Sequence, residues 1–465
     1  MSAASTVKDL TEGRPAKLIL AFSIPVFMGN LFQQFYTIID TLIVGRVLGE
    51  DALAAVGCTS SVNFLVVGFC IGLCSGFSIP VAQKFGAKDY EGMRRCVANC
   101  LWVGLFFAAA VTVTVSLNAH NILRLMKTPS NIIDMAYTYI LVIFIGIPMT
   151  MLYNVVSGLI RALGDSKTPL VFLIISSLLN IGLDIFFMVQ LQMGVFGAAL
   201  ATILSQTIAG IACLIYMICR YPLLRVQKGE WGLDRRIVLN LCNMGIPMGL
   251  QYSITAIGGV ILQSSVNTLG SEVVAAMTTS GKIGMFFACG FDALGATMTT
   301  YGGQNLGARR LDRISEGLRD CLIIGFTYAI VSFVILYFWA AKLAGLFVTD
   351  PSAELLYNAR LFLLANSASY ILLAMVNIFR FLIQGLGYSR LAILAGVAEM
   401  IARTLAGMIL VPLFGVYGAA LASPLAWLFA DAFLIPAYYY VKKRLAVVLQ
   451  YENNDTAGID PQGVN

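Results

Sequence analysis

The chain has 465 residues, of which 59% are apolar and only 12% are charged. Soluble domains carry about 25% charged residues, so this composition excludes a soluble globular protein and makes the lipid bilayer the main solvent of the fold. The net charge of +6 is expected where Lys and Arg collect in cytoplasmic loops, and no nucleic-acid partner is expected.

Apolar stretches follow one another along the chain, each long enough to cross a hydrocarbon core of about 30 Å. They lie at residues 17–45, 52–83, 96–117, 132–159, 168–192, 195–219, 237–266, 273–302, 318–347, 355–383, 391–413 and 416–441. These stretches predict an all-α polytopic membrane protein with twelve transmembrane helices.

The distribution of basic residues between the loops sets the orientation of these spans. With the N-terminus inside, the predicted inner segments hold 22 of the 30 Lys and Arg residues and the outer segments hold five. The remaining three are Lys282, Arg380 and Arg403, which fall within spans. Because basic residues collect on the cytoplasmic side, we expect a multi-pass protein of the cytoplasmic (inner) membrane with both termini in the cytoplasm.

An internal repeat divides the chain into two halves. The segment 83–88 (QKFGAK) is matched by 304–309 (QNLGAR), and 194–201 (GVFGAALA) is matched by 415–422 (GVYGAALA), both at a separation of 221 residues. Each copy holds six spans, an even number, so both copies have the same orientation and form two six-helix lobes. The expected organisation is an N-terminal lobe at 1–220, a cytoplasmic linker at 221–236, a C-terminal lobe at 237–443 and a polar tail at 444–465.

Five carboxylates lie more than two residues from the ends of the predicted spans, where charged side chains are costly and mark functional sites by default. Glu399 lies four residues before Arg403, so an internal ion pair is one interpretation of this acid. Asp292 lies towards the inner end of its span and can extend to the membrane surface. Asp431 has no evident partner, which leaves Asp40 and Asp184 as the carboxylates with a common setting.

Asp40 and Asp184 lie at similar depths, roughly 8 and 12 Å below the outer ends of the first and fifth spans at ~1.5 Å per residue. Asn180 lies one turn from Asp184, and Thr202 and Tyr139 reach the same layer from the sixth and fourth spans. These oxygens can coordinate Na⁺, and two carboxylates in a medium of low dielectric can equally share a proton. The alternative is a set of scattered polar contacts between helices.

The second lobe does not repeat the carboxylate pair, because Ile261 and Leu405 stand at the equivalent positions. One lobe is therefore expected to handle the coupling ion. Further polar side chains of the spans are candidates for the substrate cavity, and Pro25 is a candidate hinge of the first span because proline bends a transmembrane helix. The cavity candidates are Gln34, Tyr36, Gln206 and Gln251. No cofactor is expected, and with one histidine and no clustered ligands no metal is expected beyond Na⁺ at the oxygen layer.

The sequence resembles the multidrug and toxic compound extrusion (MATE) transporters. The resemblance is carried by 24–57, with Ile24-Pro25 and Thr37-Ile38-Ile39-Asp40, and by 161–169 (RALGDSKTP), and it covers roughly residues 14–444. Within the family the chain resembles the bacterial and archaeal branch related to DNA-damage-inducible exporters. That resemblance implies a cation site at Asp40, Asn180, Asp184 and Thr202, with Tyr139 nearby, and H⁺- or Na⁺-driven export of organic cations and other amphiphiles.

The predicted function is cation-coupled antiport of small, drug-like and often cationic amphiphilic molecules by a monomer. The alternative is a flippase for a lipid-linked oligosaccharide or a peptidoglycan precursor. Such a protein needs a strongly basic cavity for pyrophosphate, whereas only Lys282, Arg380 and Arg403 lie within spans. An enzyme is not expected, because the sequence offers no catalytic constellation.

Overall fold

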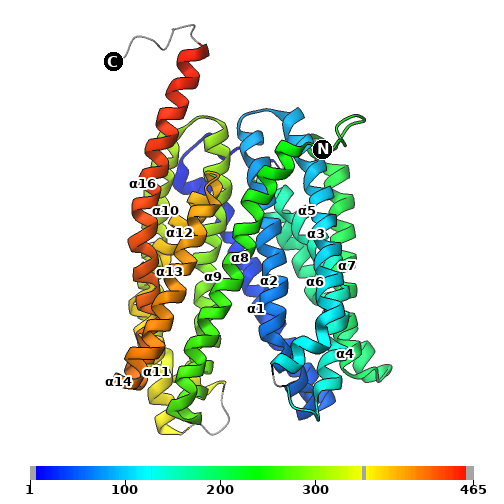
Figure 1. The fold of residues 1–465 in the computed structure, drawn as a ribbon, viewed down its shortest axis with the longest axis vertical. Coiled ribbons are helices and arrows are strands. Elements are labelled where there is room, and N and C mark those ends of the chain that lie inside the picture. Colours follow the sequence, from blue (N-terminus) through cyan, green and yellow to red (C-terminus); the bar gives the residue numbers. More distant parts are fainter. Residues whose placement is uncertain (1–6, 127, 348–351, 457–465) are drawn as a thin grey trace.

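The computed structural model describes residues 7–126, 128–347 and 352–456, and within them every element of regular secondary structure is a helix (Figure 1). The helices of the first half are α1 (Pro15–Leu48), α2 (Glu50–Gly86), α3 (Tyr90–Leu125), α4 (Ile133–Ile145), α5 (Ile147–Ala162), α6 (Lys167–Ile185), η2 (Phe186–Gln190), α7 (Gly194–Arg220) and η3 (Pro222–Leu224). Those of the second half are α8 (Arg235–Val266), η4 (Asn267–Leu269), α9 (Ser271–Gly307), α10 (Leu311–Gly345), α11 (Ala353–Ala368), α12 (Tyr370–Gly385), α13 (Ser389–Leu405), η5 (Ala406–Leu410), α14 (Val411–Phe414), α15 (Val416–Ala420) and α16 (Ala422–Thr456).

The membrane-spanning helices agree with the predicted spans in order and number. Ten helices of the described chain are long and apolar enough to cross a bilayer, and two bent pairs bring the number to twelve. The pairs are α4 with α5, bent by 44°, and α11 with α12, bent by 50°, where the sequence predicted single continuous spans. Pro148 at the start of α5 accounts for the first bend, because proline lacks a backbone donor and clashes with the preceding turn. No proline or glycine marks the second bend, at Ser369.

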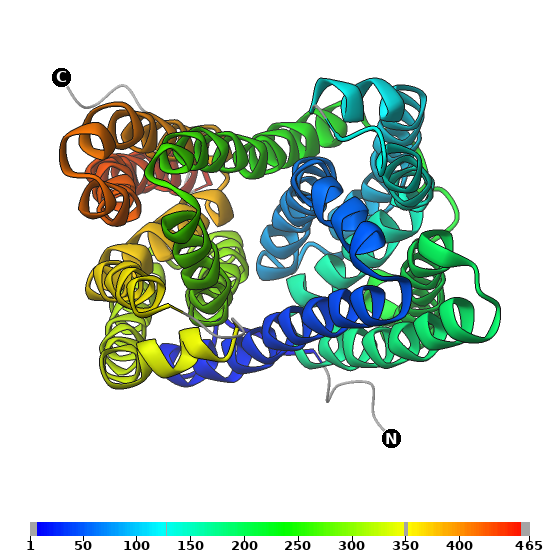
Figure 2. The same cartoon turned by 90° about the horizontal axis from the view of Figure 1, so that it is seen from below.

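The two halves form two lobes, and the first helix of each half reaches across to the other lobe. Helix α1 packs against α6 of its own half and against α9 and α10 of the other, while α8 packs along both α2 and α13. Viewed along the long axis, α1 and α8 run along opposite edges and bridge the lobes (Figure 2). The repeat in the sequence is therefore a repeat in the architecture, with α1 and α8 as its crossing elements.

The repeated Gln-x-x-Gly motifs meet at the end of the lobes where α1 begins. A Cβ on Gly86 would lie 1.9 Å from the carbonyl oxygen of Gln304, and a Cβ on Gly307 would lie 1.9 Å from that of Gln83. Gly76 and Gly245 make a similar backbone contact between α2 and α8. Because glycine alone allows backbones to approach this closely, these matched motifs bring the two lobes into direct backbone contact at this end.

The segment before α1 strengthens this closure. The Leu10 amide donates to Oε1 of Gln304 (2.9 Å), and the Gln304 side-chain amide donates to the Ala162 carbonyl (2.8 Å). The Lys8 amide donates to the Leu163 carbonyl (3.0 Å), and Leu10 is 1% exposed. The segment therefore links the end of α5 in one lobe to α9 in the other.

The predicted linker is attached to α3, whereas the predicted polar tail begins inside a helix. The linker 221–236 is attached to α3 through a contact between Arg94 and Glu230 (2.7 Å), and the Trp102 indole donates to the Trp231 carbonyl (3.1 Å). The predicted polar tail at 444–465 begins within α16, which continues to Thr456. Residues 457–465 of that tail lie outside the described residues.

Candidate functional site

The predicted oxygen layer is assembled by four helices of the N-terminal lobe. Helix α1 contributes Asp40, α6 contributes Asn180 and Asp184, α7 contributes Thr202, and α4 contributes Tyr139. Asn180 and Asp184 are 1% and 0% exposed, and Tyr139 is 8% exposed. The spacing of four residues explains why Asn180 and Asp184 share one face of α6, and the packing of α6 against both α1 and α7 brings that face to the other members.

The side chains of this layer contact one another directly. The carboxyl groups of Asp40 and Asp184 lie within hydrogen-bonding distance of each other. The Asn180 amide lies 3.4 Å from the Thr202 hydroxyl, and in its flipped orientation it donates to Oδ2 of Asp184 (3.1 Å). Tyr139 lies within electrostatic reach of both carboxylates. The structure therefore brings together all five residues that the sequence predicted for the cation site.

Tyr36 also belongs to this cluster, although the sequence placed it among the substrate-cavity candidates. It lies one turn before Asp40 on α1, hydrogen-bonds Thr202, and faces both carboxylates. The spacing of four residues from Asp40 was the signal that could have assigned it to the cation site.

Two oxygens of the cluster lack a hydrogen-bond partner although they are buried. They are Oδ1 of Asp40 and Oδ1 of Asp184. Buried polar groups are normally paired, and an unpaired buried carboxylate oxygen is costly. The donor set is entirely oxygen and amide, which suits a proton shared between the carboxylates or a hard cation such as Na⁺. Among the described residues, no group of three or more His, Cys, Asp and Glu side chains has the arrangement of a metal cluster.

A π-helical turn, η2, begins two residues after Asp184. Such turns often occur at functional sites. Its counterpart in the second lobe is η5, at nearly the same repeat position, and it follows Leu405 rather than an acid. The turn is therefore a feature of the duplicated fold, and the carboxylate pair alone distinguishes the first lobe.

The remaining predicted residues lie apart from the cluster. Gln206 accepts a hydrogen bond from Thr150 (2.5 Å), which ties α7 to α5. Gln251 is 8% exposed and accepts from the Gln384 amide (2.7 Å), so its side chain is engaged inside the second lobe. Gln34 is half-buried on α1. The candidate hinge Pro25 is buried within α1, which runs unbroken through it.

Asp165 in the motif 161–169 has a structural role at the start of α6. Asp165 accepts hydrogen bonds from the backbone amides of Lys167 (2.8 Å) and Thr168 (3.1 Å) at the start of α6. The Tyr221 hydroxyl donates to the same carboxylate (2.5 Å). Asp165 therefore stabilises the N-terminus of α6, and it joins that terminus to the end of α7.

The second lobe has a buried charge cluster of different composition. Glu399 pairs with Arg403 on its own helix (3.2 Å), as its spacing suggested, and also with Arg380 of α12. Asp431, 2% exposed on α16, faces Arg380 and Glu399, and neither of its carboxylate oxygens has a hydrogen-bond partner. The sequence detected the Glu399–Arg403 pair but not Arg380, because that partner lies 19 residues away on another helix.

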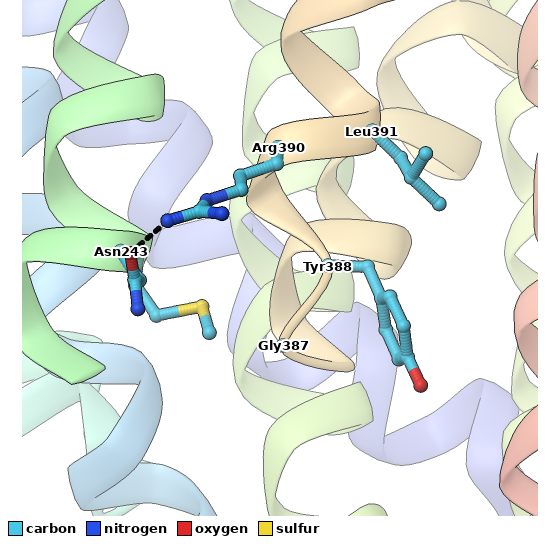
Figure 3. Close-up of a pocket in the computed structure, with 6 residues that line it drawn as sticks. Asn243, Gly387, Tyr388, Arg390 and Leu391 are labelled. Atoms are coloured by element: carbon cyan, nitrogen blue, oxygen red, sulfur yellow. Dashed lines mark hydrogen bonds between the residues drawn. The ribbon is translucent and has the colours of Figure 1, made fainter. Parts of the chain in front are cut away.

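A pocket of about 230 Å³ lies in the second lobe between α8 and the junction of α12 with α13, away from the carboxylate pair. In Figure 3 the Arg390 guanidinium extends towards Asn243 of α8, to which it donates (2.5 Å), while Tyr388 points away from that contact. The Arg444 guanidinium lies over the Tyr388 ring, 5.8 Å from its centre.

The sequence matches a known family model and is similar to two probable multidrug resistance proteins. The MatE family model matches residues 25–186 and 247–421, one copy in each lobe. "Probable multidrug resistance protein YpnP" of Bacillus subtilis is 32% identical over 74% of this chain and 77% of its own. "Probable multidrug resistance protein YoeA" of the same organism is 28% identical over 76% and 77%.

Solved structures agree with this match at the level of the fold. The outward-facing conformation of a multidrug resistance MATE family transporter superposes with a TM-score of 0.88 at 23% identity, covering 97% of this chain and 100% of that one. A MATE structure in complex with MaL6 also superposes with a TM-score of 0.88, covering 95% and 99%.

Proposed function

Because the chain belongs to the MATE family of membrane transporters, we propose that it is a cation-coupled antiporter that exports drug-like, often cationic amphiphilic molecules. The two Bacillus relatives are both described as probable multidrug resistance proteins, which supports drug-like substrates. We place the chain in the branch related to DNA-damage-inducible exporters, because its Asp40, Asn180, Asp184, Thr202 and Tyr139 match the site residues which that resemblance implies.

The observation that carries this proposal is the contact between the Asp40 and Asp184 carboxyl groups, each with one buried oxygen that lacks a partner. Two ionised carboxylates at this distance repel one another, so the cluster favours a bound proton or Na⁺ between them. Thr202, Asn180 and Tyr36 supply the neutral oxygens around that position. The residues fit either ion, because both bind to oxygen.

Because Asp40 lies on α1, which contacts both lobes, a change at the carboxylate pair can alter the packing between the lobes. Helix α1 contacts α6 of its own lobe and α9 of the other. A change at Asp40 that draws α1 towards α6 also changes its contact with α9. Pro25 lies 15 residues before Asp40 on the same helix and is the position at which α1 can bend. Cation binding and substrate binding then oppose one another, and linkage makes that opposition reciprocal.

Both termini and the linker 221–236 lie on the cytoplasmic side in this proposal, and the protein acts as a monomer. The two described ends of the chain lie at the same end of the molecule (Figure 1). Single cysteines at Asn118 and at Gln227, introduced into a cysteine-free variant, should react with an impermeant thiol reagent from opposite faces of the membrane. Reaction of both from one face would contradict the orientation.

The function is tested with purified protein in liposomes. Efflux of a fluorescent organic cation is measured with a pH gradient alone, with a Na⁺ gradient alone and with neither. The proposal expects accumulation against the substrate gradient with at least one of the two ions. Equal fluxes in all three conditions would refute coupled antiport.

A further inference from the structure

One face of α9 is open although this helix is surrounded by others. It packs against α1, α2, α10, α11 and α12. The residues left exposed are spaced as one helical stripe: Thr278, Lys282, Met285 and Asp292. At a separation of 221 residues, Gly57, Ser61 and Phe64 form the exposed stripe of α2. Helices α2 and α9 lie on the sides of their lobes that face each other (Figure 2), and they pack against one another, so the two exposed stripes belong to the helices that meet between the lobes.

Asp292 is the deepest exposed residue of the α9 stripe. It lies 15 residues before the end of α9 at Gly307, or about 22 Å along the helix. No hydrogen bond or ion pair of the described residues involves its carboxylate, so its charge is available to a molecule that enters between the lobes.

The charges around Asp292 leave its carboxylate unbalanced. In the second lobe, Arg380 and Arg403 are matched by Glu399 and Asp431, with Glu399 in contact with both guanidinium groups. Arg380 is 5% exposed and within electrostatic reach of Asp292, but it is already paired. Lys282 is the next charge on the stripe, ten residues or about 15 Å further out. The immediate surroundings of Asp292 therefore favour a positive group.

Aromatic rings lie beside this carboxylate. Tyr252 of α8 is within electrostatic reach of Asp292, and its ring lies 6.4 Å from that of Phe64 of α2. Phe64 is 46% exposed. Tyr252 also contacts the position of Gly68, where α2 and α8 begin the close approach that continues to Gly76 and Gly245. The carboxylate and the rings thus lie where the space between the lobes ends.

From Asp292 towards the end of α9 at Gly307, a positive group and closely packed side chains limit how far a cation can move. Phe381, next to Arg380 on α12, packs at Gly295, one turn inward of Asp292. Arg161, near the inner end of α5, is within electrostatic reach of Tyr252 from the other lobe. A cation that reaches Asp292 therefore meets the Arg161 guanidinium and the glycine-mediated backbone contacts between α2 and α8 beyond it.

We propose that Asp292, Tyr252 and Phe64 form the binding site for the positively charged group of an aromatic organic cation, separate from the Asp40–Asp184 pair. This inference rests on the proposed export function and names the residues that contact the exported molecule. The carboxylate neutralises the charge, and the exposed faces of Phe64 and Tyr252 contact the aromatic part, an arrangement that suits cations held by π-systems. Residues of both lobes contribute, so the site changes when the lobes move apart at the inner end.

The test compares two probes of similar aromatic surface on the purified protein. Tetraphenylphosphonium carries a positive charge, and triphenylphosphine oxide is neutral. Dissociation constants are measured for the wild type, Asp292→Asn, Asp292→Glu and Phe64→Ala. The matched control is Asp134→Asn, which removes one exposed carboxylate at the outer end of α4.

The inference expects Asp292→Asn to weaken tetraphenylphosphonium binding by tenfold or more, with triphenylphosphine oxide binding within twofold of the wild type. Asp292→Glu should retain most of the affinity, Phe64→Ala should weaken both probes, and Asp134→Asn should change neither. Tetraphenylphosphonium binding within twofold of the wild type in Asp292→Asn, or equal losses in Asp292→Asn and Asp134→Asn, would overturn it. If the wild type still shows ion-driven efflux, that outcome removes the site and leaves the antiport function intact.

Discussion

Replacing either carboxylate of the Asp40–Asp184 pair tests the coupling mechanism most directly. Two unit charges about 4 Å apart repel by about 4 kcal/mol at an effective dielectric constant of about 20, and the Asp40 and Asp184 carboxyl groups lie at least this close. That energy corresponds to a factor of roughly 10³ in an equilibrium constant. Both carboxylates are held in place by packing, since Asp184 is 0% exposed and α6 lies between α1 and α7. The repulsion is therefore available to bind a proton or Na⁺.

Asp40→Asn and Asp184→Asn each leave a single carboxylate and remove the repulsion. We expect substrate affinity in the wild type to fall by tenfold or more as the site fills with H⁺ or Na⁺. In either variant the affinity should change by less than twofold over the same range. The assay is equilibrium binding of a fluorescent organic cation to purified protein, across pH at constant salt and across Na⁺ concentration at constant pH.

Asp292→Asn is the matched comparison, because it removes an intramembrane carboxylate outside the pair. It should lower the affinity for the organic cation at every pH and Na⁺ concentration, while the dependence on the coupling ion stays that of the wild type. A variant of Asp40 or Asp184 that keeps the full ion response would refute the reasoning for that residue. A flat response in Asp292→Asn would place the second lobe in the coupling path.

Three further predictions concern stability and attachment. Glu399→Gln leaves two buried guanidinium groups without their carboxylate and should destabilise the protein by about 3–5 kcal/mol. Asp431→Asn removes a carboxylate that has no hydrogen-bond partner and should leave the melting temperature equal or higher. A larger loss of stability in Asp431→Asn than in Glu399→Gln would contradict the assigned pairing. Gly86→Ala places a methyl group against backbone and should cost about 1–3 kcal/mol, while Gly57→Ala, with nothing within 4 Å, should be neutral in the same thermal denaturation measurement. Hydrogen bonds from Arg94 of α3 lower the pKa of Glu230, so attachment of the linker to α3 should be complete above the usual glutamate pKa of about 4.3 and lost as the pH falls through the lower pKa of the folded protein. Glu230→Gln should raise the rate of limited proteolysis of the linker at neutral pH. An unchanged rate would show that the contact between Arg94 and Glu230 does not hold the linker.

The membrane architecture and the duplication were readable from the sequence because each depends on local or repeated patterns. Length and hydropathy alone define a span, since the bilayer requires about 20 apolar residues whatever their neighbours. The match between 83–88 and 304–309 also predicted two equivalent lobes. Its structural meaning was not readable, because the approach of Gly86 to Gln304 depends on how the lobes meet.

The grouping of Asp40 with Asp184 was predictable for a reason specific to membrane proteins. Helices that cross the same bilayer share one depth axis, so residue counts from the ends placed Asp40 and Asp184 in one layer before any tertiary information. Rotation about each helix axis is not given by depth. Tyr36 and Gln251 show this limit, since both were assigned to the substrate cavity, yet one packs with the carboxylates and the other pairs inside the second lobe.

The sequence by itself determined the spans, their repeat and the level of the acidic residues, because hydrophobic length and residue spacing act along one chain segment at a time. Only the tertiary structure decided which side chains meet. Arg380 reaches Glu399 from a different helix, and Asp292 remains unpaired because the helices around α9 leave one of its faces open. Pairing and openness depend on the rotation and crossing of helices that are distant in sequence, and those are fixed by packing between them.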